Sequence, residues 1–151
     1  MPATQASWAQ PQPGGTIRNV SPGSYDQSMR VTQRKGDVAT ARAIATFTRM
    51  GCDVSIPLTE SAAYDLVVDD GTQLQRVQCK YCGSARAQVD LRSIHSNSHG
   101  YMIKRVPSGA YDWLYILAED GSEYLIRDCL HGRRSITLTP AHLLGAVAES
   151  G

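Results

Sequence analysis

Hydrophobic residues first recur at helical spacing between Asp37 and Met50. Positions three and four residues apart would gather on one smooth helix face, and Gly51 supplies a stop after the last of them. Upstream, residues 1–33 are rich in Pro, Gly, Ser, Gln and Thr and poor in large apolar groups, so we expect a flexible tail there. The residues expected on the apolar helix face are Val38, Ala41, Ile44, Ala45 and Thr48.

Beyond the helix, the pattern changes to short runs of β-branched and aromatic residues separated by turn residues. Asp70-Gly71 and Asp120-Gly121 are typical hairpin turns. Thr139 and Pro140 favour the start of a last helix, with Thr139 as N-cap and Pro140 as the first helical residue. The series predicts a mixed central β-sheet flanked by helices, an α/β or α+β fold. The predicted strands are 52–57, 64–68, 74–80, 88–91, 113–117, 123–126 and 135–138.

Length and charge change this picture little. The 151 residues are enough for one domain, which we place at residues 34–151 after the tail. The formal net charge of +1 gives no general sign of a nucleic-acid partner, so a DNA site would need locally clustered basic residues. No apolar run approaches the roughly 18 residues of a membrane helix. The N-terminal residues do not resemble a secretory signal, and we therefore expect a cytoplasmic protein with reduced thiols.

The predicted hairpin around Asp70-Gly71 gathers the residues with the most suggestive chemistry. Side chains alternate along a strand, so Gln78 and Lys80 share one face, and antiparallel pairing brings Asp65 close to them. A carboxylate and an amide oxygen suit Mg²⁺, which binds few protein groups and keeps several waters. A nearby lysine can position an attacking water and offset charge on a phosphate. From spacing alone, a solvated hairpin edge is the more ordinary interpretation of these three residues.

Two other features leave alternatives open. Asp37 falls toward the apolar side of the predicted helix, where an acid is costly unless it caps the helix, pairs or binds a metal. It is therefore an N-cap, a further catalytic group, or both. The cysteines at 79, 82 and 129, with His131, would satisfy a tetrahedral zinc ion. Buried or incidental thiols are the simpler expectation, because Cys79 lies on the core face of its strand.

Several motifs, at matching spacing, resemble the PD-(D/E)xK endonucleases related to group I intron homing endonucleases. The resemblance covers roughly residues 34–139. In the family signature an Asp precedes a hairpin whose second strand ends in acid-x-Lys, and the intron-type branch is similar to this chain in carrying Gln before x-Lys. The segments that carry the resemblance are Lys35-Gly36-Asp37, Ile56-Pro57, Tyr64-Asp65-Leu66-Val67-Val68, Val77-Gln78-Cys79-Lys80, His95-Ser96-Asn97-Ser98, Tyr111-Asp112-Trp113-Leu114 and Ser135-Ile136-Thr137-Leu138.

The resemblance implies a restriction-endonuclease-like fold and a nuclease that cuts duplex DNA with Mg²⁺, or with Mn²⁺ in its place. Asp65, the Gln78 amide oxygen and the Cys79 backbone carbonyl would then hold the metal, and Lys80 would serve the attacking water. The chain departs from the signature at three places. Tyr64 replaces the proline, Gln78 replaces the second acid, and Thr40 stands where many members carry a helix acid, a role that Asp37 could fill.

Basic residues cluster after the hairpin and suggest a phosphate-contacting surface. Asn97 could contact a base or the DNA backbone, because amide side chains read adenine or bind phosphate. Nucleases of this size usually act as dimers or higher oligomers, since cutting two antiparallel strands needs two symmetric sites. The alternatives are a DNA-binding or assembly module with weakened cleavage, and an interaction protein acting through its tail. The candidate DNA contacts are Arg86, Arg92, Asn97, Lys104, Arg105, Arg133 and Arg134.

Overall fold

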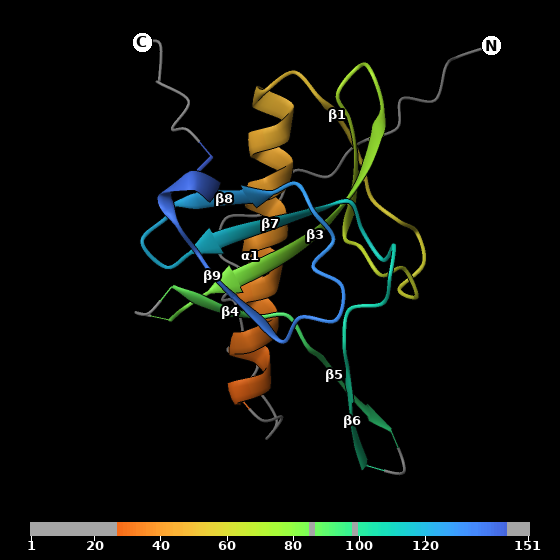
Figure 1. Ribbon diagram of the computed structural model, residues 1–151, viewed down its shortest axis with the longest axis vertical. Coiled ribbons are helices and arrows are strands. Elements are labelled where there is room, and N and C mark those ends of the chain that lie inside the picture. The colour runs from red at the N-terminus through yellow and green to blue at the C-terminus, as the bar shows by residue number, and fades with distance from the viewer. Residues whose placement is uncertain (1–26, 85–86, 98–99, 145–151) are drawn as a thin grey trace, which may run out of the picture.

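The computed structural model describes residues 27–84, 87–97 and 100–144. One long helix crosses a five-stranded sheet, and two further strand pairs lie outside that sheet (Figure 1). The sheet order is β1-β2-β3-β7-β8, while β4 pairs with β9 and β5 with β6. The elements are α1 Gln27–Arg49, β1 Asp53–Ser55, β2 Leu66–Asp69, β3 Leu74–Cys82, β4 Gln88–Asp90, β5 Ser93–Asn97, β6 Gly100–Lys104, β7 Trp113–Ala118, β8 Glu123–Ile126, β9 Ser135–Thr137 and the 3₁₀ turn η1 Pro140–His142.

The sheet combines antiparallel and parallel pairing, which confirms the predicted mixed sheet. The strands β1, β2 and β3 pair antiparallel, β3 then runs parallel to β7, and β8 returns antiparallel. The predicted hairpin turn lies between β2 and β3. The Asp70 side chain accepts hydrogen bonds from the backbone N–H groups of Thr72 and Gln73 at 2.9 and 3.0 Å. Gly71 has a φ of 85°, a left-handed conformation that glycine adopts without strain.

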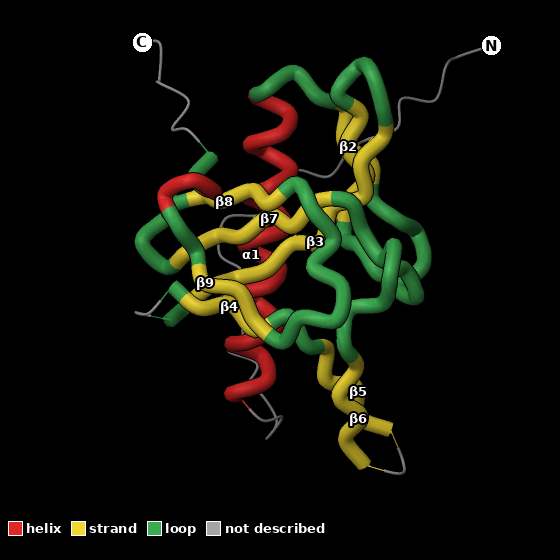
Figure 2. The backbone as a smooth tube through the Cα atoms, in the orientation of Figure 1, coloured by secondary structure: helices red, strands yellow, loops and turns green. Residues whose placement is uncertain are grey.

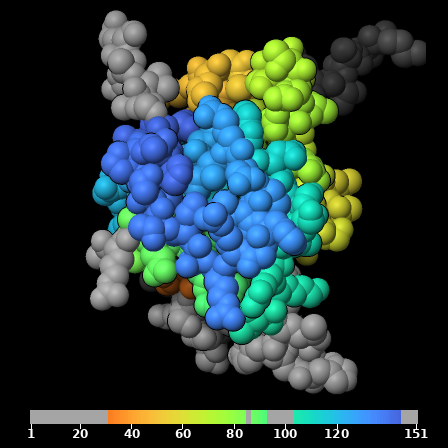
Figure 3. All heavy atoms as spheres, viewed as in Figure 1, coloured from red at the N-terminus to blue at the C-terminus, as the bar shows by residue number. Residues whose placement is uncertain are grey.

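Two apolar clusters cover the two faces of the sheet. On one face, Ala39, Ala43 and Phe47 of α1 pack against strand residues such as Leu66 and Val77. On the other face, β4, β9 and their connections supply the cover, and Figure 3 shows the second half of the chain spread over this side. In Figure 2 the helix lies behind the sheet, on the side opposite this cover. The sheet that carries the candidate hairpin is therefore held between two packed layers.

The buried face of α1 differs from the predicted one. Ala39, Ala43 and Phe47 are fully buried, whereas Val38 is 54% exposed and Ala45 faces solvent. Most of the predicted face points outward, and only its Ile44 packs partly buried against the core, because the helix has small apolar residues on both sides. The larger surface of Phe47 decides the orientation, and the alanines beside it let the helix approach the sheet closely.

A half-buried glutamate fixes the helix on the sheet. Glu123 of β8 is 13% exposed and accepts hydrogen bonds from Thr46 at 2.6 Å, Arg42 at 2.7 Å and Tyr115 at 2.9 Å. Burial alone would raise the pKa of Glu123, but these three donors outweigh it and lower the pKa. Glu123 therefore connects α1, β7 and β8 at one point and limits sliding of the helix.

Three boundaries differ from the sequence prediction. The helix begins at Gln27, so residues 27–33 of the predicted tail belong to α1, while the rest of that tail lies outside the described residues. The pair β5–β6 was not predicted, because its polar residues show no clear alternation. The predicted last helix is the short turn η1, in which Pro140 follows Thr139 without a side-chain cap bond. Among the described residues, no helix is long and apolar enough to cross a membrane.

Candidate active site

Asp65 lies immediately before β2, where it meets the end of the hairpin away from the turn. Its backbone N–H donates to the carbonyl of Val77 at 2.9 Å, which continues the β2–β3 ladder by one residue. Its Oδ2 accepts hydrogen bonds from the Gln78 amide at 2.6 Å and from the Cys79 backbone N–H at 2.7 Å. The acid and the amide that the sequence paired are thus in direct contact.

Gln78 and Lys80 occupy alternate positions of β3 and share its half-buried face. They lie level with Leu114 and Ile116 of β7 in the parallel pairing. Because β3 has a partner on both sides, the backbone that carries these two side chains is held rigidly. The predicted sharing of one face by Gln78 and Lys80 is confirmed.

The charges of Asp65 and Lys80 are only partly compensated by their surroundings. Burial raises the pKa of Asp65, although the Cys79 N–H, the charge of Lys80 and the Gln78 amide all oppose the rise. Burial lowers the pKa of Lys80, against the charges of Asp90 and Asp65. The charged forms of Asp65 and Lys80 are therefore both less favourable in this site than in water. A further ligand that offsets charge would stabilise the site.

Cys79 contributes its backbone rather than its thiol. Its side chain is buried in the cluster beneath α1, and burial raises the pKa of the thiol far above its usual range. The thiol of Cys82 packs in the cluster on the opposite face, so these two sulfurs point away from each other. Among the described residues, no group of three or more His, Cys, Asp or Glu side chains is arranged to hold a metal ion.

A cavity of about 420 Å³ opens beside Asp65, between α1 and the connection from β1 to β2. Asp37 and Thr40 line the helix wall, and Glu60 lines the facing wall. Asp37 is exposed and lies well inside α1, so it is neither the N-cap nor a group on the buried helix face. It nevertheless borders the same cavity as Asp65. Sequence reasoning missed Glu60, since nothing in its surroundings marks the β1–β2 connection as a cavity wall.

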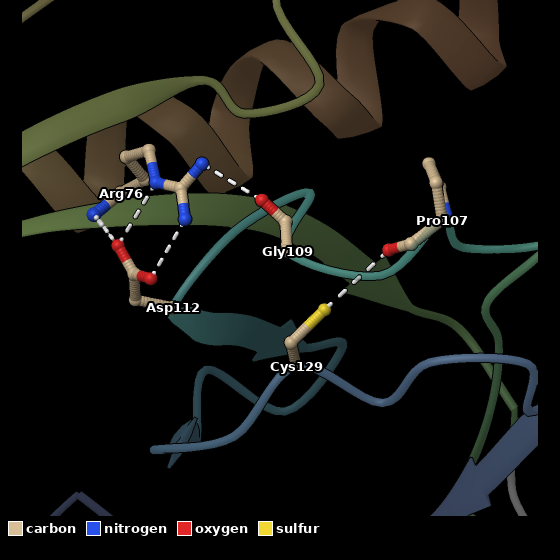
Figure 4. A network of polar contacts seen from close by, with 5 residues as sticks. All are labelled: Arg76, Pro107, Gly109, Asp112 and Cys129. Carbon is tan, nitrogen blue, oxygen red and sulfur yellow. Dashed lines mark hydrogen bonds and ion pairs between the residues drawn. The ribbon is translucent and has the colours of Figure 1, made fainter.

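A clamp holds the strand that carries the candidate residues (Figure 4). Arg76 of β3 donates from Nε and Nη2 to the two carboxylate oxygens of Asp112 at 3.0 and 2.9 Å, and from Nη1 to the carbonyl of Gly109 at 2.7 Å. The Arg76 backbone N–H also donates to Oδ2 of Asp112 at 2.8 Å, as Figure 4 shows, and the Asp112 backbone N–H donates to the Arg76 carbonyl at 2.8 Å. The clamp precedes the first paired residues of β3 and β7 and fixes their register.

The candidate DNA contacts lie on chain segments that hydrogen bonds join to one another. Leu91 donates its backbone N–H to the carbonyl of Arg134 at 2.9 Å, and Gly132 donates to the carbonyl of Val106 at 3.2 Å. These bonds join the chain segments that carry the candidate basic residues. The candidate basic residues among the described ones are all exposed. Arg86 and the side chain of Asn97 lie outside the described residues. The segments joined in this way carry Arg92, Lys104, Arg105, Arg133 and Arg134.

Arg92 already forms an ion pair within the protein. It contacts Asp90 through Nε and Nη2, the shortest contact being 2.7 Å, and lowers the pKa of Asp90 to about 2. The charge of Asp90 also acts on Lys80. Sequence reasoning missed Asp90 because only the return of the chain from β3 to β4 brings it near Lys80.

Comparison with known proteins agrees with this geometry. Residues 30–131, more than half of the chain, match the PD-(D/E)XK endonuclease family. The chain belongs to this family. A solved structure of the bacterial homing endonuclease I-Ssp6803I is similar, with a TM-score of 0.59 and 26% identity. The similarity covers 72% of this chain and 78% of that one. No curated protein sequence matches the chain.

As a member of this family, the chain resembles its signature in altered form. Asp65 and Lys80 resemble the acid and the lysine of the signature, while Tyr64 and Gln78 stand where the proline and the second acid are expected. Tyr64 is half-buried, and the Arg76 guanidinium lies 6.0 Å from its ring. Tyr64 therefore packs against the clamp and helps to place Asp65.

Proposed function

We propose that this PD-(D/E)XK protein hydrolyses phosphodiester bonds of duplex DNA with Mg²⁺, for which Mn²⁺ substitutes. The observation that carries the proposal is the contact of Asp65 with Gln78, on the strand whose same face carries Lys80. A carboxylate, an amide and an ammonium group close together match the groups that hydrolysis of a phosphodiester needs.

The donor set fits Mg²⁺ held by few protein groups. Among the described residues, both hydrogen bonds that the Asp65 carboxylate accepts end on Oδ2, which leaves Oδ1 for a cation. Gln78 currently directs its amide nitrogen at Asp65, and a turn of the amide by half a rotation brings its oxygen there instead. The Cys79 carbonyl, 3.3 Å from that nitrogen, is the third oxygen. When bound, Mg²⁺ would polarise the phosphate and lower the pKa of a bound water.

The remaining steps belong to side chains of this chain. Lys80 donates hydrogen bonds to the attacking water and to a phosphate oxygen, and so orients one and offsets charge on the other. Water adds to phosphorus and gives up a proton to solvent, the bond to the leaving oxygen breaks, and solvent supplies the proton which that oxygen takes. Asp37 borders the cavity and supplies the negative charge that Thr40 lacks.

We further propose that the exposed cations near β4, β6 and β9 contact DNA phosphates. Each neutralised phosphate releases counterions, so these contacts supply affinity without sequence preference. The protein acts as a homo-oligomer, a dimer or a tetramer, because two strands of opposite direction require two active sites related by symmetry.

Cleavage of supercoiled plasmid tests the proposal. Wild-type protein should produce nicked and linear plasmid with Mg²⁺ or Mn²⁺ and none with EDTA. Asp65→Ala should lower the rate about 10²-fold or more, as expected for a lost electrostatic group. Asp53→Ala, at an exposed acid on β1, is the matched control and should cleave normally. If wild-type protein binds duplexes, junctions or single strands but cleaves none of them with either metal, a DNA-binding or assembly module is the better description.

A further inference from the structure

The connection between β1 and β2 begins with an unusual apolar tip. Leu58 is 100% exposed and Ile56 is 66% exposed, with Pro57 between them. A lone exposed apolar residue needs no explanation, but a wholly solvated leucine beside a second large apolar side chain is a surface that binding would cover.

The position of this tip relates it to the candidate active site. Ile56, Pro57 and Thr59 line the cavity that Asp65 and Asp37 also border. Leu58 does not line that cavity and lies at its rim. A phosphodiester that reaches Asp65 therefore brings the adjacent nucleotides against this rim.

We propose that Ile56-Pro57-Leu58 is a wedge that inserts between base pairs next to the cleaved phosphate and locally unwinds the DNA. This proposal rests on the proposed endonuclease function and names how the same site deforms its substrate. Apolar side chains inserted between base steps unstack and kink duplex DNA in many architectural proteins.

The charge of the connection favours bases over phosphates as its partner. Residues 56–63 contain no Lys or Arg, and Glu60 is their one charged residue. Such a segment repels the phosphate backbone, while Leu58 gains by leaving water for the apolar face of a base. Phosphate contacts come instead from the basic segments around Arg105 and Arg133.

The tip is also held well enough to act as a wedge. β1 and β2 pair antiparallel directly before and after the connection, with Ser55 opposite Val67. Pro57 has a fixed φ, which limits the conformations that the tip can adopt. Insertion therefore orders little additional backbone.

The experiment measures unwinding rather than cleavage. A closed-circular plasmid is relaxed by a metal-independent topoisomerase in Ca²⁺ with saturating protein, then deproteinised, and its linking number is read on a gel. Wild-type protein should leave negative supercoils. Leu58→Ser should remove most of this change at equal plasmid occupancy, and should slow Mg²⁺-dependent cleavage about tenfold or more, as expected when the energy of a kinked step is lost.

Leu74→Ser is the matched control. Leu74 is 66% exposed and pairs with Asp69 at the turn end of the same hairpin, away from Asp65. This variant should unwind and cleave like wild-type, and Leu58→Met should retain unwinding.

Equal unwinding by wild-type and Leu58→Ser would overturn the wedge while leaving the nuclease proposal intact. A change of oligomeric state in Leu58→Ser, measured by light scattering, would overturn it as well, because the tip would then contact a second copy. Absence of any plasmid binding by wild-type protein would overturn both proposals together.

Discussion

Replacing Asp65 with asparagine should stabilise the protein without metal and abolish its response to metal. The asparagine oxygen can accept the same two hydrogen bonds, from Gln78 and from the Cys79 backbone, so the change removes charge while the contacts remain possible. Burial already raises the pKa of Asp65, which means that the folded protein holds this proton more tightly than the unfolded chain does.

The sign of the effect follows from that difference in proton affinity. For an acid whose pKa is raised on folding, stability is fully present below the unfolded pKa and is lost as pH rises through the folded pKa. At pH 8 the whole cost is therefore present. Single substitutions at partly buried positions typically change stability by about 0.5–3 kcal/mol, so we expect Asp65→Asn to gain about 1 kcal/mol, or about 3–6 °C in Tm. The gain should disappear near pH 3.

Mg²⁺ should reverse this order of stability between wild-type protein and Asp65→Asn. At a free Mg²⁺ concentration of 100 times its Kd, wild-type protein gains about 2.7 kcal/mol and Asp65→Asn gains little. Urea unfolding followed by circular dichroism, in EDTA and in Mg²⁺ at pH 8, measures both effects. The exposed control Asp53→Asn should respond to metal as wild-type does. A variant that is less stable than wild-type in EDTA, or that Mg²⁺ stabilises equally, would refute the reasoning.

Three further changes test the other parts of the site. Lys80→Met should retain DNA binding in Ca²⁺, measured by gel shift, while cleavage in Mg²⁺ falls about 10²-fold or more, because a positioning charge is lost and the metal ligands remain. Equal losses of binding and cleavage would count against this role of Lys80. Gln78→Glu should tighten Mn²⁺ binding about tenfold or more in calorimetry, because a second carboxylate adds charge to the site, and unchanged affinity would place the ion elsewhere. Reversing Arg133 and Arg134 to glutamate should weaken plasmid binding and flatten its dependence on log salt by about one unit for each lost phosphate contact. An unchanged slope would mean that this pair faces away from DNA.

The hairpin was predictable because its signals are local. Alternation places Gln78 and Lys80 on one face, and Asp70-Gly71 fixes where the chain reverses, so the meeting of Asp65 with Gln78 follows from counting residues. The family resemblance then supplied the chemistry that spacing alone left open.

The rest depended on tertiary contacts that no local pattern records. The helix has apolar residues on opposite sides, and only packing of Phe47 into the sheet decides that Val38 faces solvent. Glu60 and Asp90 are ordinary surface acids in the sequence. The path of the β1–β2 connection places Glu60 at the cavity, and the turn after β3 brings Asp90 near Lys80.

The parallel pairing of β3 with β7 has a consequence for biosynthesis. β3 ends at Cys82 and β7 begins at Trp113, so during translation the central strand is an open edge until some thirty further residues have been made. At about 5–20 residues per second this interval lasts about 2–6 seconds. An unpaired strand rich in buried positions readily pairs with other chains. Translation that ends within this interval would therefore yield a truncated chain that already contains Asp65, Gln78 and Lys80 but is prone to aggregate.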